Sequence, residues 1–278
     1  MRFVRQLLAV MVVAMIGSQV VAAVEDSPWL QLALGLLTAV SAVLVYGWVV
    51  RKTEHRPSTE VARKGAEAAI GRGLLIGVAM FGAVITSICF NAHYEINGLG
   101  SVQGAVGLAG FMAAAAVTEE LLFRGVLFRI IEEHTGTWIA LVLTGVLFGA
   151  SHLLNPDASL WGAVAIAIEA GGMLAAAYAA TRNLWVPIGL HFGWNFAAAG
   201  IFSSEVSGNG TPQGLLDTVT SGPAWVTGGD FGPEGSVYSV VFGALITLAF
   251  LWLAHRRGTL VPRRRRTGRV TATPTLPR

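Results

Sequence analysis

Charged side chains are scarce in this sequence. Asp, Glu, Lys and Arg make up 13% of its 278 residues, whereas a typical soluble domain has roughly twice that share. Cysteine is nearly absent, and the single Cys89 excludes an internal disulfide and a cluster of thiolate metal ligands. The sequence also lacks a G-x-S-x-G motif, so it offers no serine nucleophile of that kind. These absences exclude an ordinary soluble domain and a disulfide-stabilised one.

Apolar residues are abundant instead. They make up 54% of the chain, and the mean hydropathy is +0.62. Because a bilayer span needs about 20 apolar residues, the long apolar runs predict an all-α, polytopic membrane protein with about eight transmembrane helices. The expected spans lie near residues 7–24, 29–50, 73–90, 104–128, 138–154, 160–180, 184–202 and 237–254.

The basic residues predict the orientation in the membrane. Lys and Arg collect in segment 51–72 and after the last span, including Arg263, Arg264, Arg265, Arg266 and Arg269. Since cytoplasmic segments carry the excess of Lys and Arg, we expect both termini in the cytoplasm, in a bacterial cell membrane. The basic tail is interpreted as an anchor on anionic lipid and not as a nucleic-acid site. Residues 1–23 could be a cleaved signal peptide or an uncleaved first helix.

We expect four regions along the chain. Residues 1–99 hold the first transmembrane helices and a basic cytoplasmic loop. Residues 100–202 form a helical core, and residues 203–236 an extracytoplasmic loop with Glu205, Asp217, Asp230 and Glu234 but no Lys or Arg. Residues 237–278 contain the last span and the basic cytoplasmic tail.

Several ionisable residues fall inside the predicted spans. A carboxylate at the centre of a membrane helix costs about 2.5 kcal/mol or more, so such residues are candidates for function. Glu120 and Arg124 are four residues apart and can form a pair on one helix face. Glu119 has no such partner in its own helix, which predicts a partner on a neighbouring helix. Glu169 also lies within a span, and the sequence suggests no partner for it.

Two other segments could supply the partner of Glu119. The sequence FGASH places Phe148 and His152 on one helix face, and HFGWN does the same for His191 and Asn195. Each segment also carries glycines four residues apart, at 145 and 149 and at 189 and 193. Small residues at this spacing let membrane helices approach closely, so we expect these helices to pack against their neighbours.

These segments, EELLFRG (119–125), LFGASHL (147–153) and LWVPIGLHFGWN (184–195), together resemble the three motifs of the CPBP family of intramembrane proteases. That family includes type II CAAX prenyl endopeptidases and bacteriocin-processing or self-immunity proteins. The resemblance covers residues 100–202 and implies a peptidase. It implies that Glu119 and His152 activate a water molecule, that His191 and Asn195 stabilise the oxyanion, and that Glu120, Arg124 and Phe148 support the site.

The resemblance leaves a metal site open. One glutamate and two histidines, namely Glu119, His152 and His191, could form an open catalytic zinc site, and the family has often been described as metalloproteases. However, the sequence has no H-E-x-x-H motif, and an asparagine is a poor zinc ligand. We therefore expect no tightly bound metal, with a zinc ion on those three residues as the alternative.

Two other functions are compatible with the sequence. Buried glutamates and histidines also form proton relays in transporters, although no internal repeat is visible. A catalytically inactive membrane partner, such as an immunity protein, is the other alternative. For a peptidase we expect a membrane-associated peptide or protein as substrate, and the sequence does not show whether that substrate is prenylated.

Overall fold

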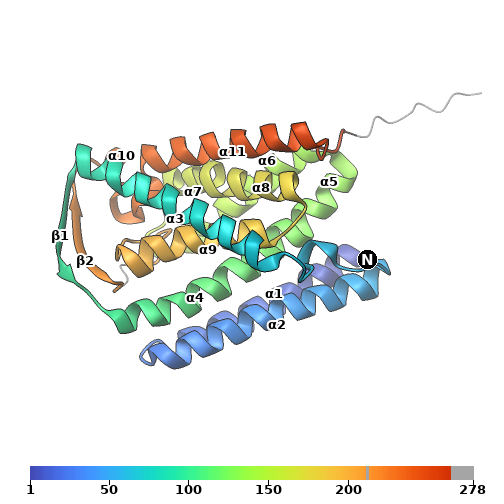
Figure 1. Ribbon diagram of the computed structural model, residues 1–278, viewed down its shortest axis with the longest axis horizontal. Helices are drawn as coiled ribbons and strands as arrows, with labels where there is room; N and C mark the ends of the chain where they lie inside the picture. Colours follow the sequence, from blue (N-terminus) through green and yellow to red (C-terminus); the bar gives the residue numbers. More distant parts are fainter. Residues whose placement is uncertain (211–212, 264–278) are drawn as a thin grey trace, which may run out of the picture.

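The computed structural model describes residues 1–210 and 213–263. The predicted contact of Arg264, Arg265, Arg266 and Arg269 with anionic lipid lies outside these residues. The described chain is a helix bundle with one small sheet at one end (Figure 1). Its main helices are α1 (Arg2–Ala22), α2 (Pro28–Glu54), α3 (Ala66–Asn91), α4 (Val102–Glu120), α5 (Arg129–Thr135), α6 (Thr137–Ser151), α7 (Leu160–Ile166), α8 (Met173–Thr181), α9 (Trp185–Asn195), α10 (Ala224–Thr227) and α11 (Val237–Arg257).

Shorter elements join or extend these helices. Three of them are π-helical: η2 (Leu121–Phe128) joins α4 to α5, η4 (Ala167–Gly172) joins α7 to α8, and η5 (Phe196–Ile201) extends α9. The 3₁₀ turns are η1 (Thr59–Val61), η3 (His152–Leu154), η6 (Gly229–Phe231) and η7 (Pro233–Gly235). Several predicted spans are therefore continuous helices built from more than one helix type.

Among the described residues, seven helical segments are long and apolar enough to cross a membrane. They are Arg2–Ala22, Pro28–Glu54, Ala66–Asn91, Val102–Thr135, Thr137–Leu154, Leu160–Thr181 and Val237–Arg257. Each corresponds to one of the predicted spans. The all-α, multi-pass membrane architecture expected from the hydropathy is confirmed.

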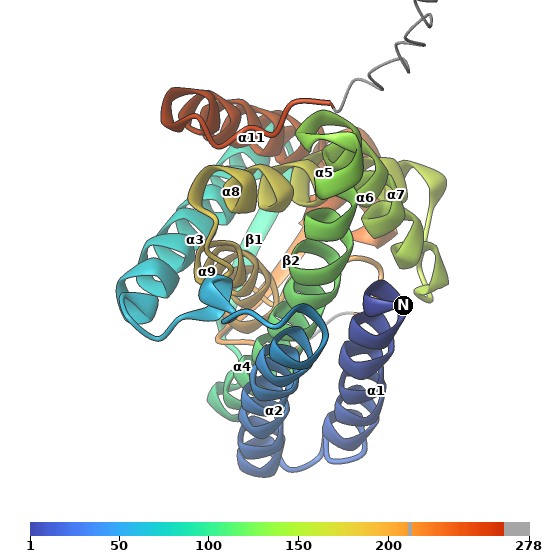
Figure 2. The same cartoon turned by 90° about the vertical axis from the view of Figure 1, so that its right-hand side faces the viewer.

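The remaining predicted span, 184–202, is the helix formed by α9 and η5. It is slightly shorter than a full span because α9 has 11 residues and η5 has six. Most of α9 is buried, and α3, α4 and α8 surround it (Figure 2). A helix enclosed by protein does not need to match the bilayer thickness. It still crosses the bundle, because Leu184 at its start bonds to Glu60 and Gly200 at its end bonds to Leu215.

Close backbone contacts hold α9 inside the bundle, as its glycines predicted. A Cβ atom on Gly189 would overlap the backbone of Ile70, and one on Gly193 would lie 2.5 Å from the carbonyl oxygen of Leu74, both in α3. A Cβ atom on Gly149 of α6 would likewise overlap the Ala163 carbonyl oxygen in α7. Only glycine permits these approaches, which bring the helix backbones together without side chains between them.

Exposed tryptophan side chains lie at two levels of the bundle, one toward each end. Six of them are more than half exposed. Trp29, Trp161 and Trp225 lie at or near the starts of α2, α7 and α10, whereas Trp48, Trp138 and Trp252 lie toward the opposite end. Tryptophan is enriched at both membrane interfaces. Between the two levels, exposed leucines and valines such as Leu44, Val142 and Leu245 cover the outer surface, as expected for helices facing lipid.

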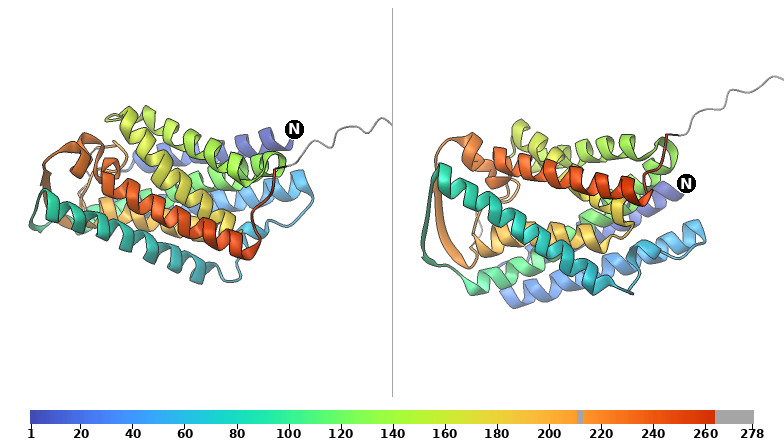
Figure 3. Two further views of the ribbon diagram at one scale, coloured as in Figure 1. Left: turned by 90° about the horizontal axis from the view of Figure 1, so that it is seen from above. Right: turned by 45° about the horizontal axis from the view of Figure 1, so that its top comes forward.

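The sheet was not expected from the sequence. Strand β1 (His93–Leu99) pairs antiparallel with β2 (Leu216–Ser221), with an irregularity between Ile96 and Gly98. The two strands are far apart in the chain, so no local hairpin pattern indicated them. They lie at the end of the bundle opposite the N-terminus (Figure 3), and they attach the predicted extracytoplasmic loop to the segment that precedes α4.

A polar network occupies the other end of the bundle. Arg129 bonds to Glu54 and Gln6, and Arg56 bonds to Glu54 and Glu60. Burial would raise the pKa of Glu60, but hydrogen bonds from Arg56 and Tyr46 outweigh this effect and hold the pKa below its ordinary value. The network joins the start of α1 to the basic segment 51–72.

The described C-terminal segment lies at this same end. The backbone of Thr137 donates to the carbonyl of Val261, and Arg2 of α1 pairs with Glu133 of α5. Figures 1 and 3 accordingly show the N-terminus and the end of α11 on the same side. The basic segments therefore share one side of the bundle, and loop 203–236 lies on the other.

We predict from this arrangement that reporter domains inserted after Lys64 and Gly258 are cytoplasmic, while one inserted after Gly210 is external. The physical reason is the clustering of Lys and Arg at one end of the bundle. Alkaline phosphatase and green fluorescent protein fusions at each position measure the side. A cytoplasmic signal at Gly210 would contradict the orientation.

Candidate active site

The EELLFRG motif lies where α4 changes into the π-helix η2. Glu119 and Glu120 are the last two residues of α4, and Arg124 lies in η2. The side chain of Arg124 donates to Oε1 of Glu120 at 2.8 Å, and both side chains are almost completely buried. The predicted pairing of these two residues is therefore present. It removes an otherwise unpaired charge from each side chain inside the bundle.

Arg124 also connects three helices. Its second terminal nitrogen donates to the carbonyl oxygens of Ala170 and Gly171 at 3.0 and 3.2 Å. These carbonyls belong to the π-helix η4, and the guanidinium also lies over the ring of Phe148 in α6, 4.6 Å from its centroid. Phe148 thus packs against the buried cation, and only Nε of Arg124 lacks a partner in the described chain.

His191 of α9 faces both glutamates. Its Nδ1 lies 2.9 Å from Oε1 of Glu120, and its Nε2 lies 3.9 Å from Oε2 of Glu119. An ionised carboxylate only accepts hydrogen bonds, so Nδ1 of His191 donates to Glu120. On another helix, His191 is thus the ionisable residue beside Glu119, at a distance longer than a hydrogen bond. Glu119 is also accessible, since about a third of its side chain (34%) is exposed.

His152 begins the 3₁₀ turn η3 at the end of α6. Its Nδ1 lies 2.7 Å from the carbonyl oxygen of Phe148, and a carbonyl can only accept, so Nδ1 carries the hydrogen. In the neutral ring Nε2 is then the basic nitrogen. No nitrogen of His152 lies within 4.0 Å of a Glu119 oxygen. The two residues expected to act together on water are therefore not in direct contact.

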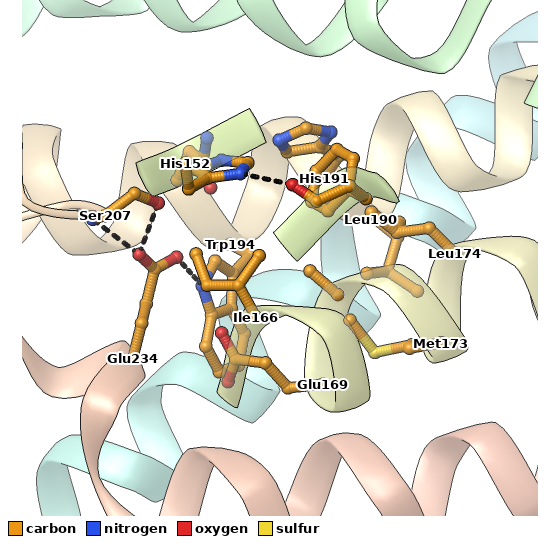
Figure 4. A pocket seen from close by; sticks show the side chains of 13 residues that line it. His152, Ile166, Glu169, Met173, Leu174, Leu190, His191, Trp194, Ser207 and Glu234 are labelled. Carbon is orange, nitrogen blue, oxygen red and sulfur yellow. Dashed lines mark hydrogen bonds between the residues drawn. The ribbon is translucent and has the colours of Figure 1, made fainter. Parts of the chain in front are cut away.

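His152, His191 and Asn195 line one small cavity (Figure 4). The side-chain amide of Asn195 makes no hydrogen bond with any described residue and is partly exposed. Glu119 does not line the cavity, but it lies beside His191, which does. The remaining wall consists of Phe148, Ile166, Glu169, Ala170, Met173, Leu174, Leu190, Trp194, Ser207 and Glu234. Residues of the second and third motifs thus line the cavity, and the first motif lies next to it, with Glu120 bonded to His191.

All three π-helices are at this site. One follows Glu120 directly, one contains Glu169, and one follows Asn195 directly. A π-turn changes the hydrogen-bonding of the helix and is frequent at functional sites. Side chains bond to carbonyls within these turns: Tyr46 and Arg129 both donate to Gly125, just as Arg124 donates to η4. The sequence contains no reliable signal for a π-turn, and none was expected.

Three polar residues of the cavity wall, Trp194, Ser207 and Glu234, were not identified as site residues from the sequence. Glu234 lies in η7, within the loop that follows α9, and is almost completely buried. It accepts hydrogen bonds from Nε1 of Trp194 and from the backbone and hydroxyl of Ser207. In the sequence, a glutamate in a glycine-rich loop looks like an exposed residue, so nothing in the loop itself indicated that Glu234 is buried. The tryptophan of HFGWN, whose N–H needs a partner when buried, was the one available signal.

The residues proposed for a zinc ion do not fit one. The described residues contain no group of three or more His, Cys, Asp or Glu side chains placed to hold a metal. Among Glu119, His152 and His191, the Nδ1 atoms of both histidines are engaged in hydrogen bonds, so only their Nε2 atoms could bind a metal. The nitrogens of His152 also lie more than 4.0 Å from the oxygens of Glu119. A catalytic zinc site needs three protein ligands within about 2 Å of one point.

Two comparisons found known proteins with similar sequences. Residues 101–197 match the sequence model of the family described as type II CAAX prenyl endopeptidase Rce1-like. The chain is also 28% identical over 179 residues to a Bacillus subtilis (strain 168) protein named "Putative membrane peptidase YdiL", which covers 59% of this chain and 70% of that protein. No solved structure gives a significant match. Together with the geometry of the site, these two matches support a CPBP-type intramembrane peptidase.

Proposed function

We propose that the protein cleaves a peptide bond of a membrane-associated substrate with a water molecule activated by Glu119 and His152. The water oxygen bonds to the scissile carbonyl carbon while its proton moves to the Glu119 carboxylate. The C–N bond then breaks, and the leaving amine takes that proton. The observation that carries the proposal is the convergence of His152, His191 and Asn195 on one cavity, with the accessible Glu119 beside it.

Glu119 is the best-placed base. Its Oε2 has no hydrogen-bond partner in the described chain, whereas Oε1 of Glu120 is already shared by Arg124 and His191. An acceptor that already binds two donors is a poor base. The Glu119 side chain is partly exposed although its Oε2 is buried, and a carboxylate that accepts no hydrogen bond from the described residues can bind and deprotonate water. The two adjacent glutamates therefore have different tasks.

His152 assists this step through Nε2. The bond from its Nδ1 to the Phe148 carbonyl fixes the tautomer and orients the ring, so that Nε2 can accept a hydrogen bond from the same water. The nitrogens of His152 lie more than 4.0 Å from the oxygens of Glu119, so in the proposed reaction the two residues act through the water molecule and not through a direct bond.

His191 and Asn195 supply the donors for the oxyanion. In the proposed reaction His191 carries a hydrogen on both ring nitrogens. His191 then donates from Nδ1 to Glu120 and from Nε2 toward the developing charge. The Asn195 amide, one helical turn later, is the second donor. Preorganised donors of this kind contribute strongly to acyl transfer.

The substrate class follows from the position of the site. The cavity lies within a bundle whose outer surface is apolar, so the substrate reaches it from the membrane or its interface. A peptide or membrane protein, with or without a CAAX-like prenylated end, satisfies this condition. Peptidomics of membranes containing wild type or Glu119→Gln protein would identify cleaved peptides, which would then serve as assay substrates.

The first prediction concerns the proposed chemistry. Glu119→Gln and His152→Ala should fold like wild type, with turnover near background for Glu119→Gln and about 10²–10⁴-fold lower for His152→Ala. Asn195→Ala removes one oxyanion donor and should lower turnover by about 10²–10³-fold. The measurements are peptide cleavage and thermal unfolding in detergent. Full activity of Glu119→Gln would contradict the assignment of the base.

The second prediction separates the two glutamates. Glu120→Gln leaves Arg124 without its counter-charge, so the free energy of unfolding should fall by about 3 kcal/mol or more, with part of the turnover retained. Glu133→Gln is the matched control, because Glu133 is 40% exposed and pairs with Arg2 at the surface. Its cost should be about 1 kcal/mol or less. A fully stable but inactive Glu120→Gln variant would reverse the two assignments.

The third prediction concerns metals. If Glu119 and His152 act directly on water, protein that is treated with chelators and shown by elemental analysis to be metal-free should keep its turnover. The check is the peptide assay before and after treatment. Loss of activity that stoichiometric zinc restores would instead favour a zinc site on Glu119, His152 and His191.

A further inference from the structure

Glu169 is a buried acid that the proposed reaction does not use. It lies in the π-helix η4 with 1% of its surface exposed, and neither carboxylate oxygen has a hydrogen-bond partner in the described chain. Gly243 of α11 packs directly against it, since a Cβ atom on Gly243 would lie 2.5 Å from both the Cα and the Cβ atoms of Glu169. This contact closes the side facing α11 and leaves the carboxylate facing the cavity.

The cavity that Glu169 faces is the one lined by His152, His191 and Asn195. Figure 4 shows the Glu169 side chain near the Trp194 indole, on the opposite side of the cavity from His152. Most of the wall between them is apolar, including Ile166 and Leu190. The cavity therefore extends from the proposed catalytic groups to a buried carboxylate.

A second carboxylate, Glu234, lies in the same cavity. Its oxygens are already used by Trp194 and Ser207, so it offers no hydrogen bond to Glu169. No lysine or arginine is among the lining residues, and Arg124 nearby is engaged by Glu120 and the η4 carbonyls. The described part of the cavity thus carries acidic groups without a balancing cation.

A buried carboxylate without a donor is costly, and a cationic group with N–H donors would relieve that cost. An aliphatic stem that ends in such a group would match the apolar wall and the acidic end. Lysine and arginine side chains have this form. A neutral apolar side chain would fill the wall but would leave Glu169 without a partner.

We propose that this cavity is the side-chain pocket of the peptidase, and that it accepts a lysine or arginine side chain of the substrate beside the scissile bond, with Glu169 as the counter-ion. The assignment of the scissile bond rests on the proposed function, whereas the binding of a cationic group by Glu169 does not. Glu234 holds Ser207 and Trp194 at the wall and adds to the negative potential.

The binding test uses n-butylammonium as the probe and 1-butanol as its neutral counterpart, at equal ionic strength. The amine should raise the unfolding temperature of the wild-type protein in detergent with increasing concentration, and the alcohol should not. Glu169→Gln should lose the amine effect, whereas Glu169→Asp, which keeps the charge, should retain part of it. Glu95→Gln is the control, because Glu95 is 61% exposed in β1, and it should respond like wild type.

The contrary results are equally clear. An equal response to amine and alcohol in wild type overturns the proposal, as does an unchanged amine response in Glu169→Gln. If Glu169→Gln does not fold, the contrast between amine and alcohol in wild type and in Glu169→Asp decides. A carboxylic-acid band in the infrared spectrum that persists in saturating amine would show a neutral Glu169 and would also overturn the proposal.

The cleavage test uses peptides that differ at single positions around the cut found by peptidomics, with lysine, arginine or norleucine at each. At one position, wild type should cleave the lysine or arginine peptide about tenfold faster or more than the norleucine peptide, and Glu169→Gln should lose this preference. Faster cleavage of norleucine at every position overturns the pocket assignment. If wild type cleaves no peptide faster than Glu119→Gln, the proposed function fails, while the amine experiment still decides the binding of the cation.

Discussion

The rest of the site depends on how the buried cation Arg124 is neutralised. A guanidinium inside a membrane protein is stable only when charges and carbonyls surround it. Glu120 supplies the charge, and the carbonyls of Ala170 and Gly171 supply further acceptors. Because these partners come from separate helices, the charge fixes the distance between them. The same Glu120 oxygen then orients His191, so the position of the imidazole depends on the ion pair.

The π-helices make this arrangement possible. In a regular helix the carbonyls of η4 would be used within the helix, and Arg124 would have fewer acceptors. In the π-helical turn after Glu120, the carbonyl of Gly125 similarly accepts hydrogen bonds from the side chains of Tyr46 and Arg129. Gly125 suits this position because the Tyr46 ring lies 2.9 Å from where its Cβ atom would be. Irregular backbone within the membrane is tolerated where protein groups satisfy it.

Segments far from the motifs in the chain complete the cavity. Loop 203–236 contributes Ser207 and Glu234, and Glu234 accepts hydrogen bonds from both Ser207 and Trp194. The same loop is attached through β2 to the strand that precedes α4. The segment after His152 also pairs with it, since the backbone of Asp157 donates to Gly208. The loop thus forms the wall at one end of the cavity, and it connects the helices that carry the proposed catalytic residues.

Local patterns in the sequence were sufficient for the membrane class, the helical spans, the Glu120–Arg124 pair and the glycine contacts of α9, because each depends on residues a few positions apart or on the hydropathy of one segment. The residues that meet at the cavity could be named from their motifs, but not their contacts. Tertiary structure alone decided that His191, and not His152, lies closest to Glu119. It also decided the strand pairing, the π-turns and the burial of Glu234. These features depend on which groups from distant parts of the chain form hydrogen bonds with a buried polar atom. Residue spacing along the chain does not encode those partners.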